Sequence, residues 1–273
     1  MVRLKTDPPR GVLNSPPADA HRFRHERYHP SADLESSVEH YWTVEWDLRG
    51  DAPHRAETLP HPSVHMIFER DGRSRIRGPA RAKFSRVLKG AGGVFAVKFT
   101  PGGFYPFVRA PVSRFSDRTV RLCDVFGADG DGLDRAVLAE SADRSRIRVV
   151  EDFLRARLPG VDQKALRATE IVYAVAKDRS ILKVRDLVDR YGLTMRTLQR
   201  LLTRYVGVSP KWVIQRYRLH EAAERLAANR AVGQASVAMD LGYSDQAHFV
   251  RDFTAVVGVS PAAYARRAAA KRG

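Results

Sequence analysis

Polar side chains able to pair with DNA bases recur on one face of a predicted helix in the C-terminal third of the chain. Apolar side chains at helical spacing define the buried face of this helix: Leu198, Leu201, Leu202 and Tyr205. Arg196, Gln199 and Arg200 fall between them and face outward. Arginine can donate two hydrogen bonds to O6 and N7 of guanine, and glutamine can form a hydrogen-bonded pair with N6 and N7 of adenine. The alternative is a solvated polar face, the usual fate of exposed arginine and glutamine.

A second predicted helix repeats this arrangement about 50 residues later. Phe249 and Phe253 mark its buried face. The outward side chains with base-pairing chemistry are Gln246, His248 and Arg251. Their alternative roles are a helix cap, the rim of the core and a phosphate contact. Because Asp245 and Asp252 make this helix less basic, we expect the first helix to carry more of the specificity.

The two helices belong to an internal repeat. Gly207-Val-Ser-Pro210 recurs 51 residues later as Gly258-Val-Ser-Pro261, and similar patterns precede both tetrapeptides. Each unit reads as an apolar helix, a glycine turn, a capping hydroxyl and a second helix. The second helices are predicted over residues 194–205 and 244–256.

Start and stop signals in each unit agree with this order. Gly192 and Gly242 would end the first helices in the left-handed conformation. Thr194 and Ser244 would accept hydrogen bonds from the free N–H groups of the second helices. The second turn contains one extra residue. Such a helix-turn-helix is also a common way to pack two helices, so the duplication adds weight to a role in DNA binding.

A single long helix is predicted to join the units. Ser209 caps it, Pro210 occupies its first position, and it extends to about Asn229. About 21 helical residues span roughly 31 Å, and successive major grooves on one face of DNA lie roughly 34 Å apart. This helix could hold two recognition helices over adjacent grooves.

The layout resembles the AraC/XylS family of bacterial transcription regulators over residues from about 165 to 267. The residues that carry the resemblance are Arg218-Leu219, Ala222, Leu226, Val237–Tyr243, Ser244–Phe249, Phe253 and Gly258–Tyr264. The resemblance implies a seven-helix DNA-binding domain with two helix-turn-helix motifs. The family positions that read base edges match Arg196, Gln199 and Arg200 of the first unit.

Other residues suit contacts to DNA phosphates, which add affinity without sequence information. Those predicted for this role are Thr194, Arg204, Lys211, Arg216, Arg218 and Ser244. The C-terminal Arg266, Arg267, Lys271 and Arg272 suit the same role or a solubilising end.

Charge supports a nucleic-acid partner. The 273 residues include 47 Lys+Arg and 31 Asp+Glu, a net charge of +16. Residues 161–273 hold 20 basic and 10 acidic side chains and so carry +10 of that excess. An acidic surface or solubility alone could also explain it. We expect no secretory signal and no membrane span, and the single Cys123 excludes an intramolecular disulfide and a multi-cysteine zinc site.

Proline content divides the chain, because 13 of the 15 prolines lie at or before Pro159. Alternating and short apolar runs before that point predict strands, so we expect an α+β protein with a β-rich N-terminal part and an all-α C-terminal part. The predicted segments are a loose arm (1–20), a β-rich sensor domain (21–131), a helical linker or dimerisation segment (132–160), the double helix-turn-helix domain (161–267) and a basic tail (268–273). A locally packed linker is slightly preferred over a dimer interface.

The N-terminal part also resembles an uncharacterised, cupin-like domain of some regulators in this family. The matching motifs are His40-Tyr-Trp, Leu59-Pro-His-Pro, Val97–Phe104, Arg118-Thr-Val and Val125-Phe-Gly. A small effector bound in this barrel is the usual expectation for a two-domain regulator. Trp42 and Trp46 could line its pocket, although a plain core role is favoured.

A cupin-type metal-dependent enzyme with a helical accessory domain is the alternative function. Seven of the nine histidines fall within residues 1–65, and His61, His65 and Glu69 share strand parity. Four strand residues span about 13 Å, however, which is too far for ligands about 2 Å from one ion. No nucleophile triad, P-loop or dinucleotide fingerprint is present. We therefore expect no enzyme activity, no metal and no cofactor.

These observations predict a cytoplasmic bacterial regulator whose main partner is double-stranded DNA. The expected further partners are RNA polymerase, a small effector and a second copy of the chain.

Overall fold

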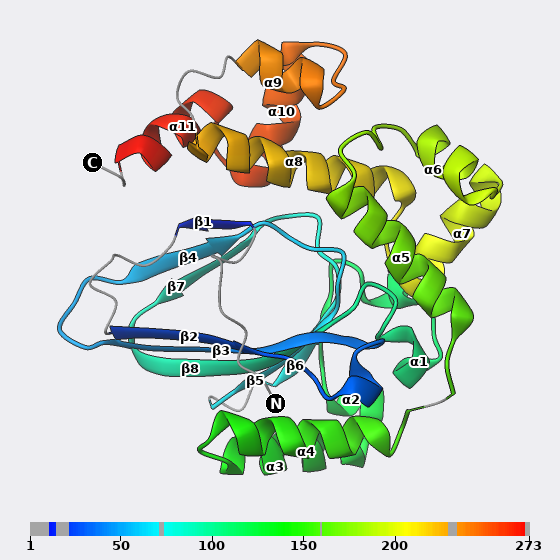
Figure 1. Ribbon diagram of the computed structural model, residues 1–273. Coiled ribbons are helices and arrows are strands. Elements are labelled where there is room, and N and C mark those ends of the chain that lie inside the picture. Colours follow the sequence, from blue (N-terminus) through cyan, green and yellow to red (C-terminus); the bar gives the residue numbers. More distant parts are fainter. Residues whose placement is uncertain (1–10, 15–21, 71–73, 159, 229–233, 271–273) are drawn as a thin grey trace.

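The computed structural model describes residues 11–14, 22–70, 74–158, 160–228 and 234–270. Two antiparallel sheets face each other in its N-terminal part (Figure 1). The smaller has the order β1 (Val12–Asn14), β4 (His54–Thr58), β7 (Phe84–Leu88). The larger has the order β2 (Phe23–Tyr28), β3 (Val38–Leu48), β8 (Gly90–Phe99), β5 (His65–Glu69), β6 (Arg75–Arg77), β9 (Thr119–Arg121). This confirms the predicted β-rich part followed by a helical part.

Both faces of the larger sheet are covered. Trp46, Val94 and Ala96 point into the space between the sheets, where they form an apolar cluster. Tyr41 and Phe95 face the opposite way, toward α3 (Ala128–Ala139) and α4 (Asp143–Arg155).

Strict alternation along β3 is interrupted. The sequence pattern predicts Val38, Trp42, Val44 and Trp46 on one face. The pairing of β3 with β8 shifts between Val38 and His40, so Val38 joins the core on the α3/α4 side while the other three face the smaller sheet. A bulge inserts one residue and thereby exchanges the two faces.

Short elements close one end of the sandwich. They are η2 (Ala32–Leu34), α1 (Tyr105–Val108), η3 (Val112–Phe115) and α2 (Cys123–Phe126). Helices α3 and α4 then pack on the outer face of the larger sheet through Leu133, Val137, Ile147 and Val150. The outward side of α4 presents charged side chains such as Arg144, Arg148 and Asp152, as a solvated helix face does.

Seven helices follow in the described residues from 160 onward. The first unit is built from α5 (Gln163–Lys177), α6 (Val184–Tyr191) and α7 (Met195–Tyr205). The rod α8 (Pro210–Ala228) leads to α9 (Gln234–Asp240), α10 (Gln246–Val257) and α11 (Pro261–Ala270). Gly192 and Gly242 have φ values of 61° and 70°, which confirms the left-handed turns that the sequence predicts.

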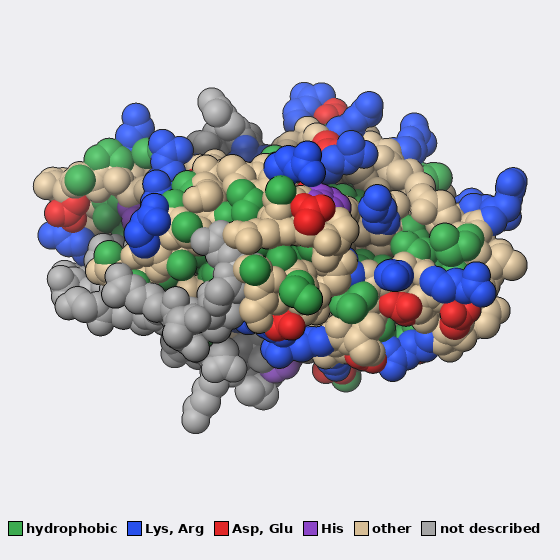
Figure 2. Space-filling model, turned by 90° about the horizontal axis from the view of Figure 1, so that it is seen from above, with side chains coloured by type: hydrophobic (Ala, Val, Ile, Leu, Met, Phe, Trp, Pro, Cys, Tyr) green, Lys and Arg blue, Asp and Glu red, His purple; other side chains and the backbone are tan. Residues whose placement is uncertain are grey.

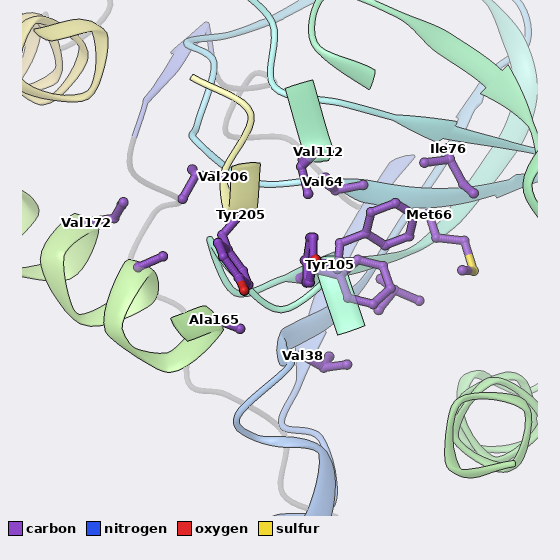
Figure 3. Close-up of a cluster of buried hydrophobic side chains, with 14 of the residues drawn as sticks. Val38, Val64, Met66, Ile76, Tyr105, Val112, Ala165, Val172, Tyr205 and Val206 are labelled. Atoms are coloured by element: carbon purple, nitrogen blue, oxygen red, sulfur yellow. The ribbon is translucent and has the colours of Figure 1, made fainter. Parts of the chain in front are cut away.

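The hydrophobic core does not break near residue 160, where the sequence divides. One continuous cluster contains Met66 and Phe95 of the sandwich together with Ile171 and Leu198 of the first unit. Figure 3 shows side chains from α5, α7, α1 and the strands meeting in this region. A separate cluster holds the second unit, and Leu59 of the N-terminal part belongs to it. The N-terminal part therefore packs against both units.

Part of the predicted loose arm is a strand, because Val12–Asn14 pairs with β4. The rest of the arm, residues 1–10 and 15–20, lies outside the described residues, as do residues 271–273 of the predicted tail. Across the portion of the chain that the structure describes, no helix is long and apolar enough to cross a bilayer.

Candidate nucleic-acid interface

The first predicted recognition helix, α7, begins as its sequence indicates. Thr194 Oγ1 accepts a hydrogen bond from the Thr197 amide at 3.1 Å, which confirms the N-cap. Leu198 and Leu202 are fully buried, so they fix which side of the helix faces outward. Arg196, Gln199 and Arg200, the residues with base-pairing chemistry, are exposed. Neither arginine makes a hydrogen bond or ion pair to any residue that the structure describes.

The second predicted recognition helix is capped one residue later than predicted. Asp245, not Ser244, caps α10: its Oδ1 accepts from the His248 amide at 2.7 Å. The extra residue in this turn explains the error, since the cap lies two residues after Gly192 in the first unit and three after Gly242 in the second. Ser244 is exposed and donates through Oγ to the Asp245 carboxylate at 3.1 Å.

Alignment of the two helices by their caps reveals an equivalence that the sequence analysis did not draw. Leu198 and Phe249 fall at the same helix position, four residues after the cap, and both are fully buried. Arg200 and Arg251 then share the sixth position after the cap, and both are exposed. The same 51-residue offset relates the Gly-Val-Ser-Pro repeats, so the sequence contained the information needed to find the pair.

The remaining base-contact candidates differ in exposure and in their contacts within the protein. Gln246 is exposed at the first position of α10. Gln199 donates to Thr203 Oγ1 at 3.2 Å. His248 lies half-buried against the Tyr243 ring, and its Nε2 is 3.5 Å from Asp252 Oδ2. This environment favours the rim-of-core alternative for His248.

Among the residues predicted to contact phosphates, Arg216 is buried and therefore does not face solvent. Its side chain is only 4% exposed, stacks on Trp212 with 4.6 Å between guanidinium and ring centroid, and donates to the Arg81 carbonyl at 2.8 Å. Burial lowers the pKa of Arg216 to about 10. The prediction failed because α8 is enclosed by the N-terminal part as well as by the two units. Lys211, one turn earlier, is exposed as predicted.

Arg218 and Arg204 are only partly available. Arg218 is half-buried between α8 and the turn at Gly242, and burial lowers its pKa. Arg204 is exposed, but Nε and Nη2 donate to the Tyr105 hydroxyl of α1 at 3.0 and 2.6 Å. Sequence reasoning could not detect this contact, because the two residues are 99 positions apart.

The helical face is rich in basic side chains. Figure 2 looks onto the side of the molecule where α6 and α8–α11 lie, and Lys and Arg predominate over Asp and Glu there. Arg196, Arg200, Lys211, Arg251, Arg266 and Arg267 are the exposed basic residues of α7, α8, α10 and α11 that make neither an ion pair nor a side-chain hydrogen bond to a described residue. Such a surface suits a polyanion.

In the sandwich, Trp46 is buried and its indole N–H points to the Lys89 carbonyl at 3.4 Å. Trp42 is half-buried in the same apolar cluster, and its Nε1 lies 3.4 Å from His65 Nδ1. Both positions fit the core role that the sequence favours.

The residues of the predicted metal alternative, His61, His65 and Glu69, have separate environments. The His61 ring contacts His220 of α8 at 4.7 Å, His65 begins β5, and Glu69 at its other end pairs with Arg75 and Arg86. Within the described residues, no three His, Cys, Asp or Glu side chains are grouped so that they could hold a metal ion.

Comparison with known proteins supports a division into two parts. Residues 26–121 match the family described as a domain of unknown function, DUF6597. Residues 187–267 match the helix-turn-helix domain family. A 76-residue stretch, 28% of the chain, is 34% identical to the HTH-type transcriptional activator RhaS of Pectobacterium carotovorum subsp. carotovorum (strain PC1). The chain spans about a quarter, 27%, of that relative's length.

Among solved structures, ToxT from Vibrio cholerae aligns over 89% of this chain and 97% of its own, with 10% identity and a TM-score of 0.37. A ToxT structure with a bound unsaturated fatty acid aligns over 77% of this chain and 86% of its own, with 9% identity and a TM-score of 0.35. At these scores the likeness supports no conclusion about ligands. The sequence matches and the geometry of the two units agree: residues 187–267 are similar to a helix-turn-helix domain, and residues 26–121 are similar to DUF6597.

Proposed function

We propose that this protein is a sequence-specific DNA-binding transcription regulator that inserts α7 and α10 into adjacent major grooves. The carrying observation is that Arg200 and Arg251 occupy equivalent, exposed positions on two recognition helices. Helix α8, which joins the units, has 19 residues and is therefore about 28 Å long. Half-sites on one face of DNA lie about one turn, roughly 34 Å, apart.

Base contacts are assigned to five exposed residues of the two helices, Arg196, Gln199, Arg200, Gln246 and Arg251, and to the half-buried His248. Lys211, the α7 cap residue Thr194, and Ser244, which precedes the α10 cap, are exposed and suit contacts to phosphates. Arg204 and Arg218 belong to the same set, although each already has contacts within the protein. Arg216 is removed from it because its guanidinium is buried.

Other partners follow from the proposed role. A regulator of this kind works in the cytoplasm with RNA polymerase and takes a small effector in its N-terminal domain. We expect little self-association through α4, because its outward side is charged. Analytical sedimentation of the protein with and without duplex DNA measures this self-association.

Selection of duplexes from a random pool at two salt concentrations tests the proposal. We expect enrichment of a motif with two elements about 10–10.5 base pairs apart, retained at the higher salt concentration. Binding that enriches no motif, or a motif confined to one element, would contradict docking of both helices.

A further inference from the structure

The N-terminal domain contacts the same point of each helix-turn-helix unit, the glycine of the Gly-Val-Ser-Pro repeat. Ser116 Oγ donates to the Gly207 carbonyl at 2.5 Å, and Lys83 Nζ donates to the Val257 carbonyl, next to Gly258, at 2.9 Å. The two glycines have φ values of 90° and 82°. A Cβ at Gly207 would lie 2.8 Å from Ser116 Oγ, and one at Gly258 would lie 2.8 Å from Lys83 Nζ. Both turns therefore fit closely against the sandwich.

Beside the first of these turns, Tyr105 holds the end of recognition helix α7. Its ring lies 4.2 Å from the Tyr205 ring between centroids, and both residues are more than nine-tenths buried. Figure 3 shows the two rings side by side at the junction of α7 and α1. The Tyr105 hydroxyl accepts both hydrogen bonds from Arg204, whose guanidinium also lies 5.3 Å from the Tyr105 ring centroid.

Two partners therefore compete for the Arg204 guanidinium: the Tyr105 hydroxyl and a DNA phosphate. Arg204 lies on the last turn of α7, is solvent-exposed, and belongs to the residues suited to DNA phosphates. A phosphate offers the guanidinium a charged partner that can accept two parallel hydrogen bonds, whereas the Tyr105 hydroxyl is neutral and offers a single oxygen. The same two N–H donors cannot serve both partners in their best geometry, since the guanidinium forms a rigid fork.

We propose that the N-terminal domain restrains the first recognition helix, and that Tyr105 withholds Arg204 from the DNA backbone while the domain is docked. This inference rests on the proposed DNA-binding function and adds its regulation. An effector or partner that binds the undocked state more tightly would free Arg204 and raise DNA affinity, because a ligand shifts an equilibrium only through its differential affinity for the two states.

A double-mutant cycle in the full-length chain tests this with the duplex obtained by selection. Tyr105→Phe keeps the ring packing and removes the hydroxyl that accepts from Arg204. We expect the Kd of this variant for DNA to fall about two- to tenfold, which corresponds to the net free energy of one hydrogen bond. The slope of log Kd against log salt should steepen by about one unit, because Arg204 then contacts a phosphate. Arg204→Ala in the Tyr105→Phe background should abolish both gains.

Tyr28→Phe is the matched control, because the Tyr28 hydroxyl bonds Asp143 on the far side of the sandwich at 2.9 Å. It should leave Kd and salt slope unchanged. Ser116→Ala, which removes a second docking contact, should also tighten binding. Specific binding by the unaltered chain with an unchanged or weaker Tyr105→Phe complex would overturn the inference and leave the proposed function intact. Absence of specific binding by every variant would overturn the function itself.

Discussion

Lys83 donates a hydrogen bond to the Val257 carbonyl at 2.9 Å, across 174 residues of sequence. Val257 ends recognition helix α10, so its carbonyl belongs to the negative end of the helix dipole, where a lysine is favourable. Lys83 also pairs with Glu57 of β4 at 2.7 Å. The second helix-turn-helix unit is thereby attached to the smaller sheet.

Replacement of Lys83 by methionine should loosen this attachment. We expect faster hydrogen exchange in the last turn of α10 and at the start of α11, because the tether and its favourable charge are both lost. The amides of α7 serve as the internal control, since Ser116 and Tyr105 hold that helix independently. Equal acceleration in both helices would indicate global destabilisation instead.

Arginine replacements test base reading. Arg200→Ala and Arg251→Ala should each relax preference at a different base pair, with the two positions about 10–10.5 base pairs apart, and each should cost about 1–3 kcal/mol of binding free energy. Arg196→Ala should relax a third position, next to that of Arg200. The measurement is repeated duplex selection with each variant.

Arg185→Ala provides the control for loss of charge alone, because Arg185 is an exposed arginine of α6 that pairs with Asp189. It should leave the selected motif unchanged. Uniform weakening on all sequences by the three recognition-helix variants would contradict direct readout.

Lys211 and Arg216, both cations of α8, should behave in opposite ways. Lys211→Ala should reduce the slope of log Kd against log salt by about one unit, with little change in stability, since the side chain is exposed. Arg216→Ala should lower the unfolding free energy by about 1–3 kcal/mol and leave the salt slope unchanged, because its buried hydrogen bond to the Arg81 carbonyl is lost. A changed slope for Arg216→Ala would show that the guanidinium reaches DNA.

The cap of α10 gives a stability prediction with a defined pH dependence. The pKa of Asp245 is lowered, first by the hydrogen bond from the His248 amide. A carboxylate with a lowered pKa in the folded state stabilises above its unfolded pKa, about 3.9, and loses that effect as pH falls through the folded value. Asp245→Ala should lower the melting temperature at pH 7, whereas Ser244→Ala should not. The difference between Asp245→Ala and the unaltered chain should shrink below pH 4.

Acid should destabilise the sandwich through His65. Burial is the main cause that lowers the pKa of His65 to about 3, and Lys98 and His40 contribute in the same direction. The unfolded chain binds a proton near pH 6.5 while the folded chain does not, so stability should fall as pH drops from 7 toward 4. His65→Asn should flatten this fall in denaturant titrations at several pH values. If the stability of His65→Asn falls with decreasing pH as steeply as that of the unaltered chain, protonation of His65 is not the cause of the acid destabilisation.

The helices of the C-terminal part were predictable because their signals are local. Apolar spacing, Gly192, Gly242, Thr194 and the Ser209-Pro210 start each act within a few residues, and all occur as expected. Ser244 was mistaken for the cap because Ser and Asp are both good caps and stand side by side. The bulge in β3 left no sequence signal that strict alternation could detect.

The sequence by itself determined the α+β class, the repeated helix-turn-helix pattern and which faces of α7 and α10 carry polar side chains, since helical periodicity sorts residues without reference to distant parts. Only the tertiary structure decided that Arg216 is buried, that Tyr105 engages Arg204, and that one core joins the sandwich to the first unit. Those facts depend on which segments meet after folding. Contacts across 99 to 174 residues are set by packing of whole surfaces, and no local pattern encodes them.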